Sequence, residues 1–242
     1  EHKADANLFD GTRNLLGGEV EIDTEGRENI RTPALRRGGT VTLLCNLASR
    51  ARKDKCRSGG NIERVRAIAA RADLLVPPQA VEQALDRMAR EITAVLADKD
   101  PVVLCVVTGG IVVVGRLLPR LGFPLRLDYV HATRYQGTTR GGDLDWVHRP
   151  SAAVRGQHVL VVDDILDEGV TLDRVLRACR EDGALSVHSA VLVEKERARA
   201  LDIQADFVGV RVPDRYLIGY GLDYHNYFRN ADGIFAVADQ DI

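Results

Sequence analysis

The sequence lacks several features by which protein classes are commonly recognised. Its four cysteines show no C-x-x-C spacing, so we expect reduced thiols in a cytoplasmic protein and neither a disulfide framework nor a zinc site. The net charge of −2 gives no reason to expect binding to nucleic acid or to a membrane. No apolar run reaches the length of a membrane span, because Gly109-Gly110 and Arg116 interrupt the longest one. The first residues do not resemble a secretory signal peptide.

Two common phosphate-binding motifs, G-x-x-x-x-G-K-[ST] and G-x-G-x-x-G, are also absent. The most informative stretch present is His158–Thr171, HVLVVDDILDEGVT. Its apolar β-branched run, 159–162, is typical of a strand buried on both faces of a parallel sheet. Adjacent strand residues point to opposite faces, so we expect the chain to leave the sheet at Asp163 and Asp164. A helix is predicted over 172–180.

This order of strand, acidic loop and helix is suited to a ligand that carries phosphate and hydroxyl groups. Free N–H groups and the positive dipole end at a helix N-terminus bind phosphate. Asp163 and Asp164 could bind sugar hydroxyls, directly or through Mg²⁺, and Asp167 is a candidate acid or base. The alternative is that these acids are only solvated turn residues. An EF-hand is disfavoured, because its alternation of acids is missing.

The remaining patterns predict alternating strands and helices, and therefore an α/β fold with a parallel, doubly wound core. Helices are expected over 61–72, 79–96 and 111–121, and strands over 102–107, 125–132, 186–193 and 207–212. Residues 74–78 are expected to end the first helix and to start the domain. Residues 133–147 read as a long loop, which is either functional or a flexible hairpin.

The N-terminal part, residues 1–71, is predicted to be an extension of unassigned role that is poorly ordered, followed by a domain over 72–242. Residues 27–57 are rich in Arg and Lys, which would also suit a basic arm for RNA. Phe9 is the single aromatic residue before residue 72, so base stacking has little support. Residues 41–47 could form a strand or a short helix. A chain starting near Ala72 is expected to fold and keep its activity.

The motif VLVVDDILDEGVT resembles the phosphoribosyl pyrophosphate (PRPP) signature of type I phosphoribosyltransferases. The stretch DFVGVRVPDRYLIGYGLDYHNYFRN, 206–230, is similar to the 6-oxopurine branch, the hypoxanthine-guanine phosphoribosyltransferases. The resemblance covers roughly Ala72–Val237. It implies a twisted, mostly parallel sheet with helices on both faces and a small hood formed by the domain's N-terminal helix and C-terminal segments.

The same resemblance implies purine salvage, in which phosphoribosyl passes from PRPP to N9 of hypoxanthine or guanine and gives IMP or GMP plus pyrophosphate. It implies Mg²⁺ as cofactor, PRPP and a 6-oxopurine base as partners, and a cytoplasmic homo-oligomer, either a dimer or a tetramer. Two alternatives remain: a PRPP-binding regulatory protein without catalysis, and a related transferase that prefers xanthine.

The resemblance also implies a role for individual residues. The predicted catalytic residue is Asp167, which would take a proton from N7 of the purine. The ribose of PRPP would be bound by Asp163 and Asp164. The residues of the 5′-phosphate loop are Asp167, Glu168, Gly169, Val170 and Thr171. The pyrophosphate would contact Val107, Thr108, Gly109, Gly110 and Arg229. The purine would contact Lys195, Tyr216 and Leu217. The metal ligands would be Asp223, Asp163 and Asp164, and the lid would carry Arg134 and Tyr135.

Three positions depart from the family pattern. Many members have Lys at the position of Thr108, Thr at that of Glu168 and Ser at that of Arg134. The backbone N–H groups at Thr108 are unaffected by the change, but the role of its side chain is open. An acid at Glu168 is unfavourable beside a phosphate unless its side chain points away.

Overall fold

The computed structural model describes residues 20–22, 28–30, 59–134, 144–149 and 154–242. The chain divides into two compact units, 1–43 and 44–242. In the first, β1 (Val20–Ile22) and β2 (Glu28–Ile30) form an antiparallel pair. The predicted element at 41–47 and most of the basic stretch lie outside the described residues.

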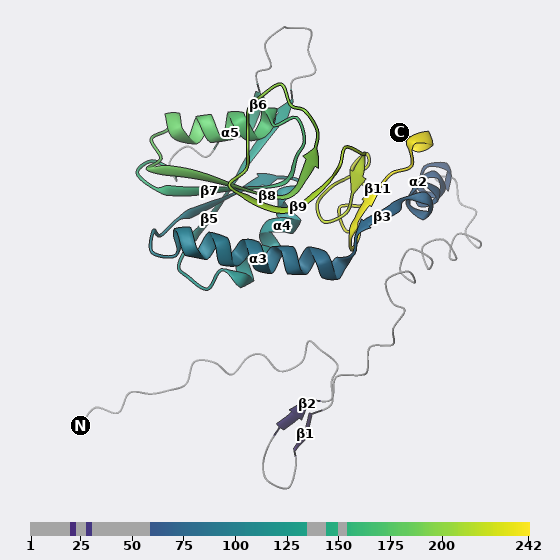
Figure 1. Ribbon diagram of the computed structural model, residues 1–242, viewed down its shortest axis with the longest axis horizontal. Helices are drawn as coiled ribbons and strands as arrows, with labels where there is room; N and C mark the ends of the chain where they lie inside the picture. Colours follow the sequence, from purple (N-terminus) through teal and green to yellow (C-terminus); the bar gives the residue numbers. More distant parts are fainter. Residues whose placement is uncertain (1–19, 23–27, 31–58, 135–143, 150–153) are drawn as a thin grey trace. The chain divides into compact units, whose positions relative to one another are not determined.

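The second unit is built on a six-stranded sheet with the order β6-β5-β4-β7-β8-β9 (Figure 1). Its strands are β4 (Val102–Val107), β5 (Arg126–Arg134), β6 (Leu144–His148), β7 (His158–Leu166), β8 (Ser186–Glu196) and β9 (Phe207–Pro213). Five of these strands are parallel and β6 is antiparallel to β5. The predicted α/β fold with a mostly parallel sheet is confirmed. Because the chain passes from β4 to β5 on one side and returns to β7 on the other, the strand order reverses at β4, where such sheets bind ligands.

Helices cover both faces of this sheet, which explains the continuous apolar runs of its central strands. The helices α3 (Pro78–Leu96) and α4 (Gly110–Leu117) pack on one face, against Val103, Leu160 and Val162 among others. The helix α5 (Val170–Glu181) packs on the opposite face, against side chains such as Val159 and Val161. Alternate residues of each strand therefore enter two separate cores.

The hood is a second, antiparallel sheet with the order β10-β11-β3. It consists of β10 (Leu217–Ile218), β11 (Ile234–Ala236) and β3 (Asp73–Val76), and α2 (Gly59–Arg71) packs on it. Ile68 of α2 is 1% exposed and belongs to a cluster with Ile218 and Phe235. The first helix ends before residues 74–78, as expected, but a strand was not predicted there: β3 forms because it pairs with β11, a partner far away in the sequence. The proposed boundary at residue 72 stays a prediction.

Strand β7 is longer than expected, and the prediction that the chain leaves the sheet at the paired acids is wrong. β7 pairs with β8 as far as Leu166, but it pairs with β4 only as far as Val162. Beyond Val162, β7 is no longer paired with β4 on that side. The two acids stay in the strand, directly after the point where this pairing stops.

Two other segments differ from expectation. The helix predicted over 111–121 ends at Leu117 and continues as a 3₁₀ turn, η2 (Leu118–Arg120), where Pro119 supplies no N–H for α-helical bonding. The segment predicted as a loop, 133–147, begins and ends in strands, since β5 reaches Arg134 and pairs there with Leu144 of β6. A last turn, η3 (Asp239–Asp241), follows β11. Within the described part of the chain, no helix is long and apolar enough to cross a membrane.

Candidate functional site

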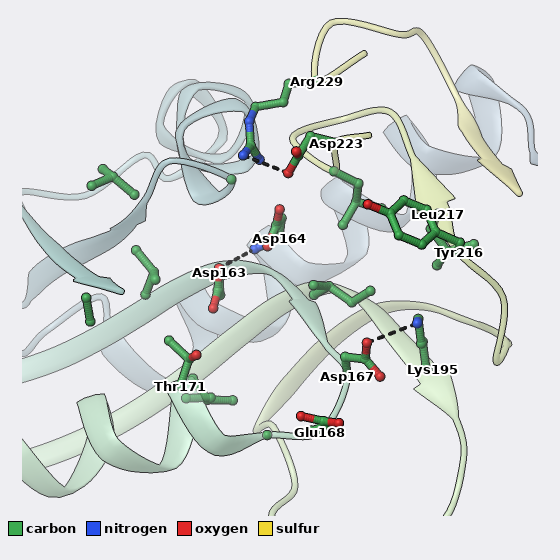
Figure 2. A pocket seen from close by; sticks show the side chains of 18 residues that line it. Asp163, Asp164, Asp167, Glu168, Thr171, Lys195, Tyr216, Leu217, Asp223 and Arg229 are labelled. Carbon is green, nitrogen blue, oxygen red and sulfur yellow. Dashed lines mark hydrogen bonds and ion pairs between the residues drawn. The ribbon is translucent and has the colours of Figure 1, made fainter. Parts of the chain in front are cut away.

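A cavity of about 730 Å³ lies at the carboxyl ends of β4, β7 and β8, partly under the hood (Figure 2). The predicted site residues that line it are Val107, Gly109, Asp163, Asp164, Asp167, Glu168, Gly169, Thr171, Lys195, Tyr216, Leu217, Asp223 and Arg229. The site therefore assembles residues that are more than a hundred positions apart in the sequence.

Several predicted residues are not part of this lining. Thr108, Gly110 and Val170 lie next to lining residues but do not line the cavity themselves. Arg134 ends β5, and Tyr135 lies outside the described residues. The lining also contains residues that were not predicted: Val106, Ala132, Ile165, Leu172 and Leu222. Nothing in the sequence distinguishes these apolar side chains from core residues.

The paired acids of β7 are buried at the centre of the cavity. Asp163 is 8% exposed and Asp164 is 9% exposed, and Asp163 Oδ1 accepts a hydrogen bond from the Asp164 N–H at 2.9 Å. Burial raises the pKa of Asp163 well above its usual range, and the charge of Asp164 raises it further. Burial also raises the pKa of Asp164, although the charge of Arg229 opposes this. A bound cation or hydroxyl donors would offset the cost of two charges here.

Asp163 and Asp164 suit an Mg²⁺ ion that takes only part of its ligands from the protein. Among the residues that the structure describes, no group of three or more His, Cys, Asp or Glu side chains could hold a metal ion. Mg²⁺ is commonly held by one or two carboxylates together with oxygens of the substrate and water. The arrangement therefore suits a metal ion that arrives with a polyphosphate ligand and contacts Asp163 or Asp164.

The loop after β7 presents the N-terminus of α5 to the cavity. Gly169 caps this helix in the left-handed conformation, with φ of 83°, and a Cβ there would lie 2.4 Å from Cγ2 of Ile203. The first turn of α5, with Thr171, offers unpaired backbone N–H groups of the kind that bind phosphate. Glu168 is exposed and lines the cavity beside this turn.

On the opposite side of the cavity, the backbone at Gly109 and Gly221 lies too close to its neighbours to leave room for a side chain. A Cβ at Gly109 would lie 1.9 Å from Asp164 Oδ2, and a Cβ at Gly221 would lie 2.3 Å from the carbonyl oxygen of Gly109. Nη2 of Arg229 lies 2.7 Å from Asp223 Oδ1, and Nη1 donates to the Gly221 carbonyl at 2.6 Å. Asp223 is thus paired with a cation through Oδ1, and its Oδ2 accepts a hydrogen bond from the Asn226 N–H at 2.6 Å.

The predicted purine-binding residues lie near the predicted catalytic residue. Nζ of Lys195 donates to Asp167 Oδ2 at 3.0 Å, and Nη1 of Arg197 donates to Asp167 Oδ1 at 2.8 Å. Burial disfavours the charged form of Asp167, but these two cations outweigh that effect and lower its pKa. Asp167 is therefore ionised, and it can accept a proton once a cation releases one of its oxygens. Arg197 was not predicted; it directly follows β8, two residues after Lys195.

The aromatic side chain predicted to stack on the purine lies at the mouth of the cavity (Figure 2). Tyr216 is 37% exposed and packs edge-on against Tyr224, with ring centroids 5.7 Å apart. Leu217 is the first residue of β10. Its side chain is buried and packs in the core between the hood and the main sheet. One face of the Tyr216 ring could therefore take a flat ligand without rearrangement of the core.

Comparisons with known proteins agree with this geometry. Residues 73–225 match the family model described as the phosphoribosyl transferase domain. The hypoxanthine-guanine-xanthine phosphoribosyltransferase of Tritrichomonas foetus is 36% identical over 151 residues, which cover 62% of this chain and 82% of that protein. The hypoxanthine-guanine phosphoribosyltransferase of Bacillus subtilis (strain 168) is 29% identical over 158 residues, 65% of this chain and 88% of the relative. A solved structure of a hypoxanthine-guanine-xanthine phosphoribosyltransferase superposes with a TM-score of 0.58 at 31% identity, and covers 69% of this chain and 94% of its own.

Proposed function

Because this chain belongs to the phosphoribosyltransferase family, in its hypoxanthine-guanine branch, we propose that it transfers the phosphoribosyl group of PRPP to N9 of a 6-oxopurine. Hypoxanthine and guanine are the proposed acceptors, and IMP or GMP and pyrophosphate the products. The observation that carries the proposal is the single cavity that joins a helix N-terminus, two buried carboxylates and a Lys–Asp pair.

The proposed binding mode of PRPP follows from the chemistry of each group. The 5′-phosphate would accept hydrogen bonds from backbone N–H groups at the start of α5 and from the Thr171 hydroxyl. The ribose hydroxyls would donate to Asp163 and Asp164. The pyrophosphate would lie against the backbone of the loop at Gly109, with Arg229 as its cationic partner. Mg²⁺, when bound with PRPP, would neutralise charge on the pyrophosphate and make it a better leaving group.

The purine would bind between Lys195, Tyr216 and Asp167. Lys195 is a donor with no acceptor capacity, so it would favour a carbonyl at C6 over an amino group. In the transfer, the bond from C1′ to the pyrophosphate oxygen breaks and the bond from C1′ to N9 forms. The purine loses the proton on its N7, and the Asp167 carboxylate would accept it. Pyrophosphate leaves with the electron pair of the broken bond to C1′.

Two further features stay proposals. A relative 36% identical is named for xanthine as well as hypoxanthine and guanine, so xanthine is a second candidate acceptor. We also propose a homo-oligomer, dimer or tetramer, which sedimentation would measure.

The experiment that tests the function is an assay of pyrophosphate release. The full chain would be incubated with Mg²⁺, PRPP and one of four bases: hypoxanthine, guanine, xanthine or adenine. Release with 6-oxopurines and none with adenine is expected. Tight PRPP binding without release for any base would instead support a PRPP-binding regulator.

A further inference from the structure

The ends of three neighbouring parallel strands carry alternating charges beside the cavity. Asp167 directly follows β7, Lys195 is the last but one residue of β8 and Arg197 directly follows that strand, and Asp214 directly follows β9. The register of β7 with β8 and of β8 with β9 aligns these strand ends. The order along the sheet edge is therefore acid, two bases, acid.

These four side chains form a closed ring of ion pairs. Nζ of Lys195 lies 3.0 Å from Asp167 Oδ2 and 3.4 Å from Asp214 Oδ1. Nη1 of Arg197 lies 2.8 Å from Asp167 Oδ1, and its Nε lies 3.6 Å from Asp214 Oδ2. Each cation thus contacts both acids, and each acid offers one oxygen to each cation. The formal charges of the ring sum to zero.

The ring has an inner and an outer pair. Asp167 and Lys195 line the cavity, whereas Arg197 and Asp214 are not part of its lining. The Lys195 side chain is 10% exposed, and those of Asp167, Arg197 and Asp214 are 34%, 32% and 42% exposed. An ammonium group has three hydrogens; Lys195 donates one of them to Asp167, and even if its ion pair with Asp214 takes a second, a third is left. The third can be donated to a ligand in the cavity.

An isolated Lys195–Asp167 pair would pose a problem for purine binding. A carbonyl that takes Lys195, or an N–H that takes Asp167, would leave the other charge with no partner in a partly buried place, which is costly. The ring removes this problem because each inner residue keeps a partner in the outer pair. Asp167 retains Arg197, and Lys195 retains Asp214.

Resting on the proposed function, we propose that Arg197 and Asp214 are positioning residues for the purine. They hold Lys195 and Asp167 directed into the cavity, so that a 6-oxopurine can bind both without leaving either charge unpaired. Tyr216 follows Asp214 by only two residues, so the ring lies close in the chain to the aromatic residue of the purine site.

Other charges near the ring are already engaged elsewhere. Arg199 donates to the Asp167 carbonyl at 2.7 Å and pairs with Glu194 at 3.3 Å, and Arg211 pairs with Glu194 at 3.0 Å. Glu168 adjoins Asp167 in the chain, and its charge acts on Arg197. The cations that contact the Asp167 carboxylate in the described residues are therefore Lys195 and Arg197.

The test compares Arg197→Gln, Asp214→Asn and the double variant. Each single variant leaves the ring with an unbalanced charge, so KM for the purine should rise about tenfold while the Kd for PRPP changes by less than about twofold. The double variant restores the charge balance of the ring. Its loss of purine binding should therefore be smaller than the sum of the losses of the two single variants. Arg177→Gln, which removes an exposed ion pair with Asp173 on α5, is the matched control and should behave as wild type.

A pH profile of kcat/KM for the purine separates positioning from general destabilisation. Removal of Arg197 removes a cation from Asp167, so the acid limb should move to higher pH in Arg197→Gln and return in Arg197→Lys. In Asp214→Asn, Lys195 and Arg197 both stay in contact with Asp167, so the acid limb should not move to higher pH.

The inference is overturned if the single variants keep the wild-type KM, if PRPP binding falls as much as purine binding, or if the losses add in the double variant. In each of those cases the proposed function would still stand, provided that the wild-type chain releases pyrophosphate with a 6-oxopurine. If the wild-type chain released no pyrophosphate with any base, the proposed function and this inference would both fail.

Discussion

Gly109 offers a direct test of the close approach between the β4–α4 loop and Asp164. Its φ is −61°, a value that any residue can adopt, so replacement by Ala introduces a steric effect without backbone strain. The new Cβ would lie 1.9 Å from Asp164 Oδ2, 2.4 Å from Cγ and 2.8 Å from Oδ1. The carboxylate would have to move by about 1.5 Å to reach an ordinary contact distance.

Displacement of Asp164 should be seen in ligand binding. A hydrogen bond to a charged group contributes about 1.5–3 kcal/mol, so loss of one such contact would weaken PRPP binding roughly 10- to 100-fold. The variant Gly115→Ala on α4 is the control, because a Cβ there meets no atom within 4 Å. It should bind PRPP as wild type and gain about 1 kcal/mol of stability from helix propensity.

The assay is calorimetric titration with PRPP and Mg²⁺, together with thermal unfolding of both variants. Overpacking without relief would cost about 1–3 kcal/mol of folding free energy, which the unfolding temperature reports separately. If Gly109→Ala were folded and bound PRPP with the wild-type Kd, Asp164 would have no role in PRPP binding, and our assignment of the site would be wrong.

Four further predictions follow from the same geometry. Asp167→Asn should lower kcat roughly 10²–10⁴-fold with little change in PRPP affinity, and near-normal kcat with lost affinity would exclude it as the base. Lys195→Ala should weaken purine binding by about 1.5–3 kcal/mol, and an equal loss for PRPP would place Lys195 elsewhere. Burial raises the pKa of Asp163, so charging it as pH rises destabilises the ligand-free fold. Asp163→Asn should therefore raise the unfolding temperature more at about pH 8 than at about pH 5, and an increase independent of pH would contradict this. Ile68→Ala should cost about 2–5 kcal/mol in chemical denaturation, because Ile68 is 1% exposed under the hood; no loss would show that α2 does not stabilise the hood.

The sequence alone determined much of the central layer of this protein. Its apolar β-branched runs fixed β4, β8 and β9 to within a few residues, because strands covered on both faces must be apolar throughout. The sequence also indicated which residues of β7 and α5 would bind a ligand. Acids and glycines at the carboxyl end of a buried strand lie where open α/β sheets bind their ligands. The paired acids, Asp167 and Thr171 all line the cavity.

Tertiary structure alone decided the rest, since it depends on contacts between distant segments. The strand β3 exists because β11 pairs with it across the hood, and a run of four residues carries no such information. β7 continues through its acids because β8 still pairs with it beyond Val162, where its pairing with β4 stops. The charge ring that joins Asp167 to Arg197 and Asp214 arises from the register of three strands, which sets the spatial order of residues that local sequence patterns treat as independent.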